Sequence, residues 1–133
     1  MSLIGIHLDN LDQIFDQQYN QIKHFQIFVD PIVDYHKRYN KELQYIQKNN
    51  IQIAVHSSYT VNISRNWEEG DWWVELVIRE IEQASIIGAY CLVLHTGKRL
   101  ELAESQAINN MYSFLLHINR KNDNRTFKNK DKI

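Results

Sequence analysis

Short apolar runs alternate along the chain with longer segments in which apolar residues recur every three or four positions. The short runs predict strands, which cover residues 3–8, 25–29, 51–55 and 90–94. The periodic segments predict amphipathic helices, which cover about residues 11–20, 32–49, 72–87 and 102–119. This strict alternation predicts four βα units, and therefore an α/β fold with a parallel sheet and right-handed crossovers.

The three longer helical segments each show one apolar stripe, which we expect to face the core. In residues 32–49 the stripe is Tyr35, Tyr39, Leu43 and Ile46. In residues 72–87 it is Trp73, Val77, Ile81 and Ala84, and Gly88 stands where a glycine caps a helix. In residues 102–119 it is Ile108, Met111, Leu115 and Ile118. Both a doubly wound sheet and a barrel satisfy these patterns.

Two predicted strands lead directly into a histidine: Ile53–Val55 into His56 and Cys91–Leu94 into His95. Neighbouring parallel strands end about 5 Å apart, so the two rings could share one metal ion. His7, on the first predicted strand, points toward the same end. Imidazole suits zinc, but a zinc site needs about three or four protein ligands. Taken alone, each histidine is more often a hydrogen-bonded structural residue than a ligand.

A loop of about fifteen residues follows His56, and a loop of this length in a compact domain usually has a function. It carries Tyr59, Asn62 and Trp67. We interpret Trp67, Trp72 and Trp73 as core residues rather than as platforms for stacked bases.

Composition places the chain among globular proteins: 133 residues, of which 44% are hydrophobic, with a formal net charge of -1. No apolar run is long enough to span a bilayer, the N-terminus shows no charged leader, and Cys91 is the single cysteine. We therefore expect a soluble cytoplasmic or nuclear protein that is neither secreted nor bound to a membrane. From Arg120 onward the sequence contains six Lys or Arg and only two Asp. We therefore expect residues 1–119 to fold and residues 120–133 to form a basic, disordered tail.

Two motifs contain the candidate ligands His56 and His95. The first is Val55–Ile63, with His56, Tyr59 and Asn62 in a His-x-x-Tyr-x-x-Asn pattern. The second is Leu92–Lys98, with His95 and Gly97 in a His-x-Gly turn. Together these motifs resemble the N-terminal half of the endonuclease IV family of abasic-site DNA repair nucleases. Ile4-Gly5-Ile6-His7 resembles the opening strand of that family and Gln26-Ile27-Phe28 its second, so the resemblance covers about residues 3–118.

The resemblance implies a zinc-dependent endonuclease that hydrolyses the phosphodiester on the 5′ side of an abasic nucleotide. It implies a TIM-type barrel of eight βα units, of which this chain supplies about four, a truncated or half barrel. His56 and His95 correspond to zinc ligands, and Tyr59 and His7 to DNA-binding positions. The family uses three zinc ions, and this chain carries ligands for at most one of them. Abasic DNA is the implied partner.

Departures from the family open other possibilities. Leu8-Asp9-Asn10-Leu11 stands where the family has two glycines, and Asp30-Pro31 replaces a basic loop that faces DNA. The remaining zinc ligands belong to strands five to eight, so we expect the chain to be inactive or incomplete alone and to pair with itself or with a second half-barrel chain. The alternatives are a non-catalytic remnant or interaction module, and a barrel resembling sugar isomerases or epimerases.

Overall fold

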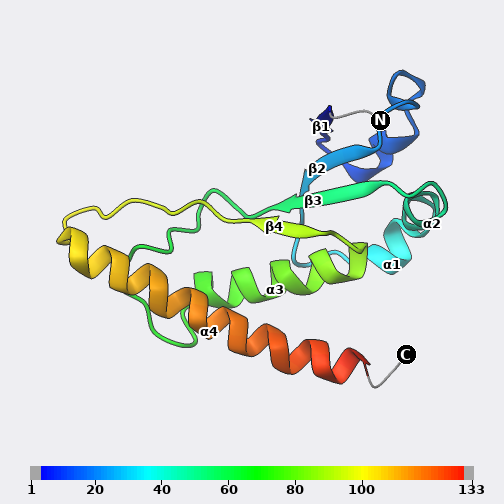
Figure 1. The fold of residues 1–133 in the computed structure, drawn as a ribbon. Coiled ribbons are helices and arrows are strands. Elements are labelled where there is room, and N and C mark those ends of the chain that lie inside the picture. The colour runs from blue at the N-terminus through cyan, green and yellow to red at the C-terminus, as the bar shows by residue number, and fades with distance from the viewer. Residues whose placement is uncertain (1–3, 131–133) are drawn as a thin grey trace. The chain divides into compact units, whose positions relative to one another are not determined.

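The chain forms an α/β structure around one parallel sheet (Figure 1). The computed structural model describes residues 4–130, and the side chains of residues 4–123. The strands are β1 (Gly5–His7), β2 (His24–Phe28), β3 (Gln52–His56) and β4 (Cys91–Val93). They pair in the order β1-β2-β3-β4, and every pair is parallel. The predicted α/β class with a parallel sheet and the four predicted strands are therefore confirmed, whereas the barrel stays a prediction.

The chain is divided into two compact units. The first comprises residues 1–58 and 82–94 and contains the sheet, whereas the second comprises residues 59–81 and 95–133. The predicted division into residues 1–119 and a tail is a different one and stays a prediction.

The core of the first unit is built from alternate residues of the strands and from the helices beside them. In β2, Phe25 and Ile27 are buried and their neighbours are only partly so, whereas β3 is buried from Ile53 to His56. An alternating pattern is typical of a strand with one covered face, and a continuous apolar run of a strand covered on both. The rest of the buried cluster consists of Leu8, Leu11, Ile14, Tyr35, Ile46, Ile51, Ala84 and Ile87.

The first predicted helix is replaced by two short 3-10 helices, η1 (Leu11–Phe15) and η2 (Gln17–Tyr19). The break falls at Asp16, whose backbone is extended and whose side chain accepts a hydrogen bond from the amide of Gln18 at 3.1 Å. A short acidic side chain competes with the helical backbone in this way, so the prediction of one helix over residues 11–20 is wrong.

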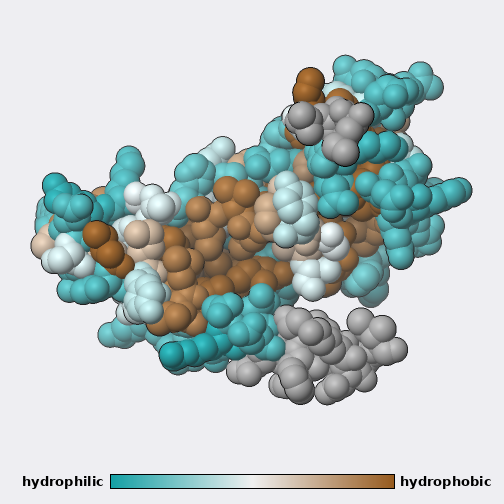
Figure 2. Space-filling view, in the orientation of Figure 1, coloured by the Kyte–Doolittle hydropathy of each residue, from teal (hydrophilic) through white to brown (hydrophobic). Residues whose placement is uncertain are grey.

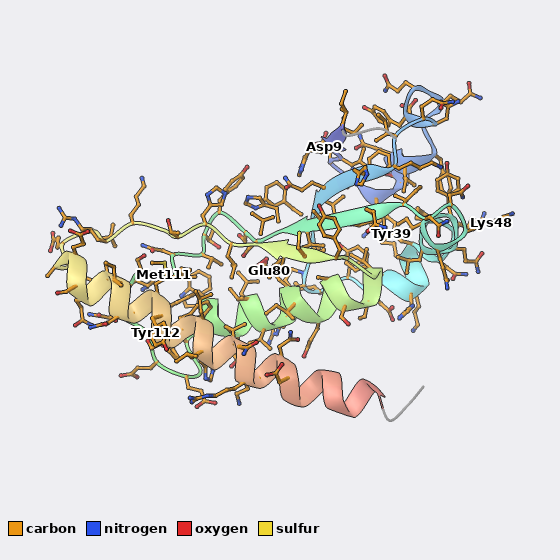
Figure 3. All side chains as sticks on the ribbon, viewed as in Figure 1. Asp9, Tyr39, Lys48, Glu80, Met111 and Tyr112 are labelled. Atoms are coloured by element: carbon orange, nitrogen blue, oxygen red, sulfur yellow. The ribbon has the colours of Figure 1, made fainter. Side chains whose placement is uncertain are left out.

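The second predicted helix is interrupted as well. It consists of α1 (Tyr35–Arg38) and α2 (Asn40–Lys48), separated at Tyr39, where φ is -121° and ψ is 31° (Figure 3). It begins later than predicted because Asp30 Oδ1 accepts from the amide of Ile32 in a turn and Asp34 then caps the helix through Lys37. The predicted stripe is nevertheless correct, since Tyr35 and Ile46 are buried and Tyr39 and Leu43 pack against the core.

The third helix, α3 (Trp72–Ile87), has the predicted bounds. Gly88 adopts a φ of +78° after it, and the amide of Ala89 donates to the carbonyl of Ala84 at 2.9 Å, which is a glycine C-cap.

The last helix, α4 (Glu104–Lys130), buries a different face from the one predicted. Among the described side chains of this helix, Ala107, Asn110, Phe114 and Ile118 are buried, whereas Ile108 is 51% exposed and Leu115 44% exposed. Met111 and its exposed neighbour Tyr112 are labelled in Figure 3. The predicted stripe is thus correct at Ile118, partly correct at the half-buried Met111, and wrong at Ile108 and Leu115, because a small and a polar residue occupy two of the buried positions.

The basic tail has a helical backbone as far as Lys130, and residues 131–133 lie outside the described residues. Its disorder stays a prediction. Within residues 4–130, no helix combines the length and the apolar character needed to cross a membrane. Figure 2 shows hydrophobic residues reaching the surface among mainly hydrophilic ones.

Candidate functional site

His56 is the last residue of β3 and is only 8% exposed. Its Nδ1 lies 2.6 Å from the backbone oxygen of Ser57. A carbonyl oxygen can only accept, so Nδ1 carries a proton and donates it. In the neutral ring this leaves the lone pair on Nε2. A histidine that binds a metal commonly has this arrangement, with the second ring nitrogen oriented by a backbone carbonyl or a carboxylate.

His7 ends β1 and has the opposite polarity. Its Nδ1 lies 3.3 Å from Nε2 of Gln26, whose amide donates to the ring. The neutral ring then carries its proton on Nε2, which makes His7 a hydrogen-bond donor. A donor of this kind suits an anionic oxygen better than it suits a metal ion.

Phe28, at the end of β2, lies between the two histidines. Its ring centroid is 5.0 Å from that of His7 and 5.0 Å from that of His56, and both contacts are edge-to-face. In the sheet Phe28 is also the register partner of His56. The structure therefore brings His7 and His56 to the same edge of the sheet, on either side of one aromatic ring.

His95 follows the end of β4. Val93 is the register partner of His56, and His95 lies two positions further along the chain, exposed and in the second unit. The expected pairing of the third and fourth strands is confirmed. That His56 and His95 share an ion stays a prediction. Among the side chains that the structure describes, no three His, Cys, Asp or Glu residues form a group that could hold a metal ion.

Tyr59 lies in the loop after β3, in the second unit, and its side chain is 82% exposed. Three positions later, Asn62 binds the turn that follows His95. Its Nδ2 donates to the backbone oxygen of Lys98 at 2.9 Å, and its Oδ1 accepts from the amides of Lys98 and Ser64, each at 3.1 Å. Sequence reasoning placed Asn62 in a motif but gave it no role. One indication of this role was present in the sequence: Asn62 and Gly97 belong to the two motifs, Val55–Ile63 and Leu92–Lys98, that carry the resemblance to endonuclease IV.

The same loop is also held by α4. Asn110 is 7% exposed, and its Nδ2 donates to the oxygen of Ser64 at 3.1 Å and to Oδ1 of Asn66 at 2.9 Å. Trp67 donates from Nε1 to Oγ of Ser113 at 3.1 Å.

The tryptophans differ in environment. Trp67 packs edge-on against Phe114, and Trp73 lies 5.0 Å from the same ring and is 1% exposed. Trp72 is 61% exposed, so the prediction of a core position is wrong for this residue. It occupies the solvent side of the first turn of α3, next to the buried Trp73.

A cavity of about 280 Å³ lies at the ends of β1 and β2, in the first unit. Its polar lining consists of Asp9, Asn10, Asp30, Tyr35, Arg38 and Tyr39. The hydroxyl of Tyr35 accepts from the amide of Asp30 at 2.9 Å, and burial raises the pKa of this phenol. The two aspartates stand at the positions where the sequence departs from the endonuclease IV pattern.

A parallel βα sheet with histidines at the carboxyl edge defines an α/β protein with a candidate site at its strand ends. No family model matches the chain. Half of the chain is 38% identical, over 71 residues, to the probable endonuclease 4 of Mesoplasma florum. Over this half of the chain, the similarity confirms the predicted resemblance to endonuclease IV. The match spans 24% of that protein.

Proposed function

We propose that this chain provides the first part of a zinc-dependent phosphodiesterase site that acts at abasic positions in DNA. Two features support the proposal beside the similarity to the probable endonuclease 4. In the described sheet each strand lies beside the next strand of the chain, in the order β1-β2-β3-β4. The strands of a βα barrel follow one another in this way, whereas the strand order of a doubly wound sheet reverses at one point. The histidines follow the carboxyl ends of the strands, where barrel enzymes have their active sites.

The observation that carries the proposal is the geometry of His56. Its buried ring is oriented by the Nδ1 hydrogen bond to the backbone oxygen of Ser57, an arrangement that is common among metal-binding histidines. His95, which belongs to the second unit, is the other ligand that the resemblance implies.

Zinc bound there would supply a water of lowered pKa and a positive charge beside the phosphate. The chain's own residues would bind and orient the DNA. His7 would donate from Nε2 to a phosphate oxygen, and the exposed Tyr59 would contact the strand next to the abasic position. The further ligands, and those of two more ions, would come from outside the described residues.

Zinc binding tests the proposal most directly. With zinc alone as the titrant, we expect the wild-type protein to bind one ion per chain in calorimetry, and the His56→Ala variant to lose that binding. The matched control is His36→Ala, which changes an exposed histidine of α1. Equal zinc binding by His56→Ala and the wild type would exclude His56 as a ligand.

DNA binding tests the substrate class. In fluorescence anisotropy with zinc present, we expect a duplex that carries one tetrahydrofuran abasic analogue to bind more tightly than the intact duplex. Tyr59→Ala should remove most of this preference. Equal binding of the two duplexes by the wild-type protein would contradict a role at abasic sites.

One observation favours a second candidate, a non-catalytic interaction module. α4 exposes an apolar stripe opposite its buried face: Ile108, Tyr112, Leu115 and Leu116. Exposed stripes and strand edges favour association. A concentration-dependent mass in light scattering, together with no zinc binding, would support this candidate, and a monomer at all concentrations would contradict it.

A further inference from the structure

Two loops that lie far apart in the sequence are joined through one side chain. Asn62 binds both the amide and the carbonyl of Lys98, 36 positions later. Because one side-chain amide binds both polar groups of the Lys98 backbone, the backbone at this residue has little freedom to move or rotate. We call Asn62, Ser64 and residues 96–98 the loop clamp.

Gly97 shows that the two loops are fitted closely together. Its φ is +81°, and a Cβ at this position would lie 2.0 Å from Oδ1 and 2.9 Å from Cγ of Asn62. No side chain other than hydrogen fits there while Asn62 keeps its hydrogen bonds. The glycine is therefore required both by its backbone conformation and by the amide packed against it.

Ser64 adds a second connection between the loops. Its Oγ donates to the backbone oxygen of Thr96, and its own amide donates to Asn62. The three residues that directly follow His95 thus each have a contact in the loop that carries Tyr59. Asn110 of α4 binds the carbonyl of Ser64 in turn, so the clamp is anchored to a helix.

We propose that Asn62 is a positioning residue for His95 and Tyr59, with Gly97 as its required partner. Asn62 acts through the backbone of residues 96–98, and it holds the turn after His95 in one fixed relation to the loop that begins beside Tyr59. This inference rests on the proposed function, because it gives the clamp a role in zinc binding. The clamp itself is defined by hydrogen bonds that do not depend on that role.

A double-mutant cycle tests whether the clamp exists. Gly97→Ala in the wild-type background forces Asn62 out of its hydrogen bonds and adds backbone strain, so we expect it to lower Tm by about 4 °C or more. In the Asn62→Ala background the same change adds only the strain, and we expect less than half of that decrease. Equal decreases in both backgrounds would overturn the clamp.

Zinc affinity tests whether the clamp positions His95. Measured with zinc alone at a temperature where circular dichroism shows the variant to be folded, Asn62→Ala should raise the Kd about tenfold, as loss of an orienting residue does. Asn62→Asp keeps the acceptor for the amides of Lys98 and Ser64, so we expect it to recover part of the affinity. A matched control is Asn109→Ala, which changes an exposed residue of α4.

The outcomes separate the two proposals. An unchanged Kd in folded Asn62→Ala would leave Asn62 a purely structural residue and overturn the positioning role. No zinc binding by the wild type would overturn the proposed function and the positioning role with it. The double-mutant cycle would still decide whether the clamp exists.

Discussion

At the scale of single residues, hydrogen-bond polarity separates side chains that the sequence treats alike. His7 and His56 both end strands at one edge of the sheet, yet one accepts at Nδ1 and the other donates from it. The hydrogen-bond partner sets the role of Nδ1 in each ring, because the amide nitrogen of Gln26 donates and the carbonyl oxygen of Ser57 accepts. The proposed roles, a phosphate contact for His7 and zinc binding for His56, require these two polarities.

Tyr35 leads to a prediction about alkaline stability. Burial raises the pKa of its phenol above the ordinary value of 10.0, so the folded protein keeps the proton at a pH where the unfolded chain loses it. The group therefore leaves stability unchanged below about pH 10 and lowers it as the pH rises from there through the raised pKa. Tyr35→Phe should remove this alkaline loss.

The measurement is the free energy of unfolding in urea at pH 8 and at pH 10.5. At pH 8 the Tyr35→Phe variant should be about 1 kcal/mol less stable, because the amide of Asp30 loses its acceptor. The difference between the two pH values should nevertheless be smaller than in the wild type. Tyr112→Phe, on the exposed side of α4, is the control and should behave like the wild type. An unchanged alkaline loss in Tyr35→Phe would contradict the prediction.

At the scale of elements, the number, order and type of the main helices and strands could be predicted, because apolar periodicity reports which residues face a core. The bounds of α3 followed from its long stripe and from Gly88. The breaks at Asp16 and Tyr39 could not be predicted, since a single side-chain hydrogen bond or one residue of backbone decides each of them. The face of α4 was missed because Asn110 is buried through its bonds to Ser64 and Asn66, which no local pattern reveals.

The orientation of α4 can be tested with two neighbouring residues. Phe114 is 0% exposed and Leu115 is 44% exposed, although the sequence pattern favoured Leu115 as the core position. Truncating a buried phenylalanine costs about 3 to 5 kcal/mol, whereas a surface change costs about 0.5 kcal/mol or less. We expect Phe114→Ala to lower the free energy of unfolding by the larger amount and Leu115→Ala by the smaller. Comparable losses in the two variants would show that the predicted stripe faces the core after all.

At the scale of the whole molecule, the candidate residues fall into two groups, since His7 and His56 belong to the first unit and Tyr59, Asn62 and His95 to the second. The sequence could predict which residues follow the strands. It could not predict that Asn62 joins two loops, because that contact depends on hydrogen bonds between residues 36 positions apart. α3 is the element that belongs to both units, with residues 72–81 in one and 82–87 in the other.

This continuous helix leads to a prediction about cooperativity. Unfolding either unit removes the packing partners of part of α3, and a helix that loses them at one end is marginal in water at the other. We therefore expect the units to unfold together, as most single domains of this length do.

The three tryptophans, Trp67, Trp72 and Trp73, all lie in the second unit, so their fluorescence reports on that unit alone. Far-UV circular dichroism reports on both. The two signals should give the same urea midpoint within error, and Gly88→Ala, which strains the cap of α3 in the first unit, should shift both midpoints equally. A shift in the dichroism midpoint without a shift in the fluorescence midpoint would show that the units unfold independently.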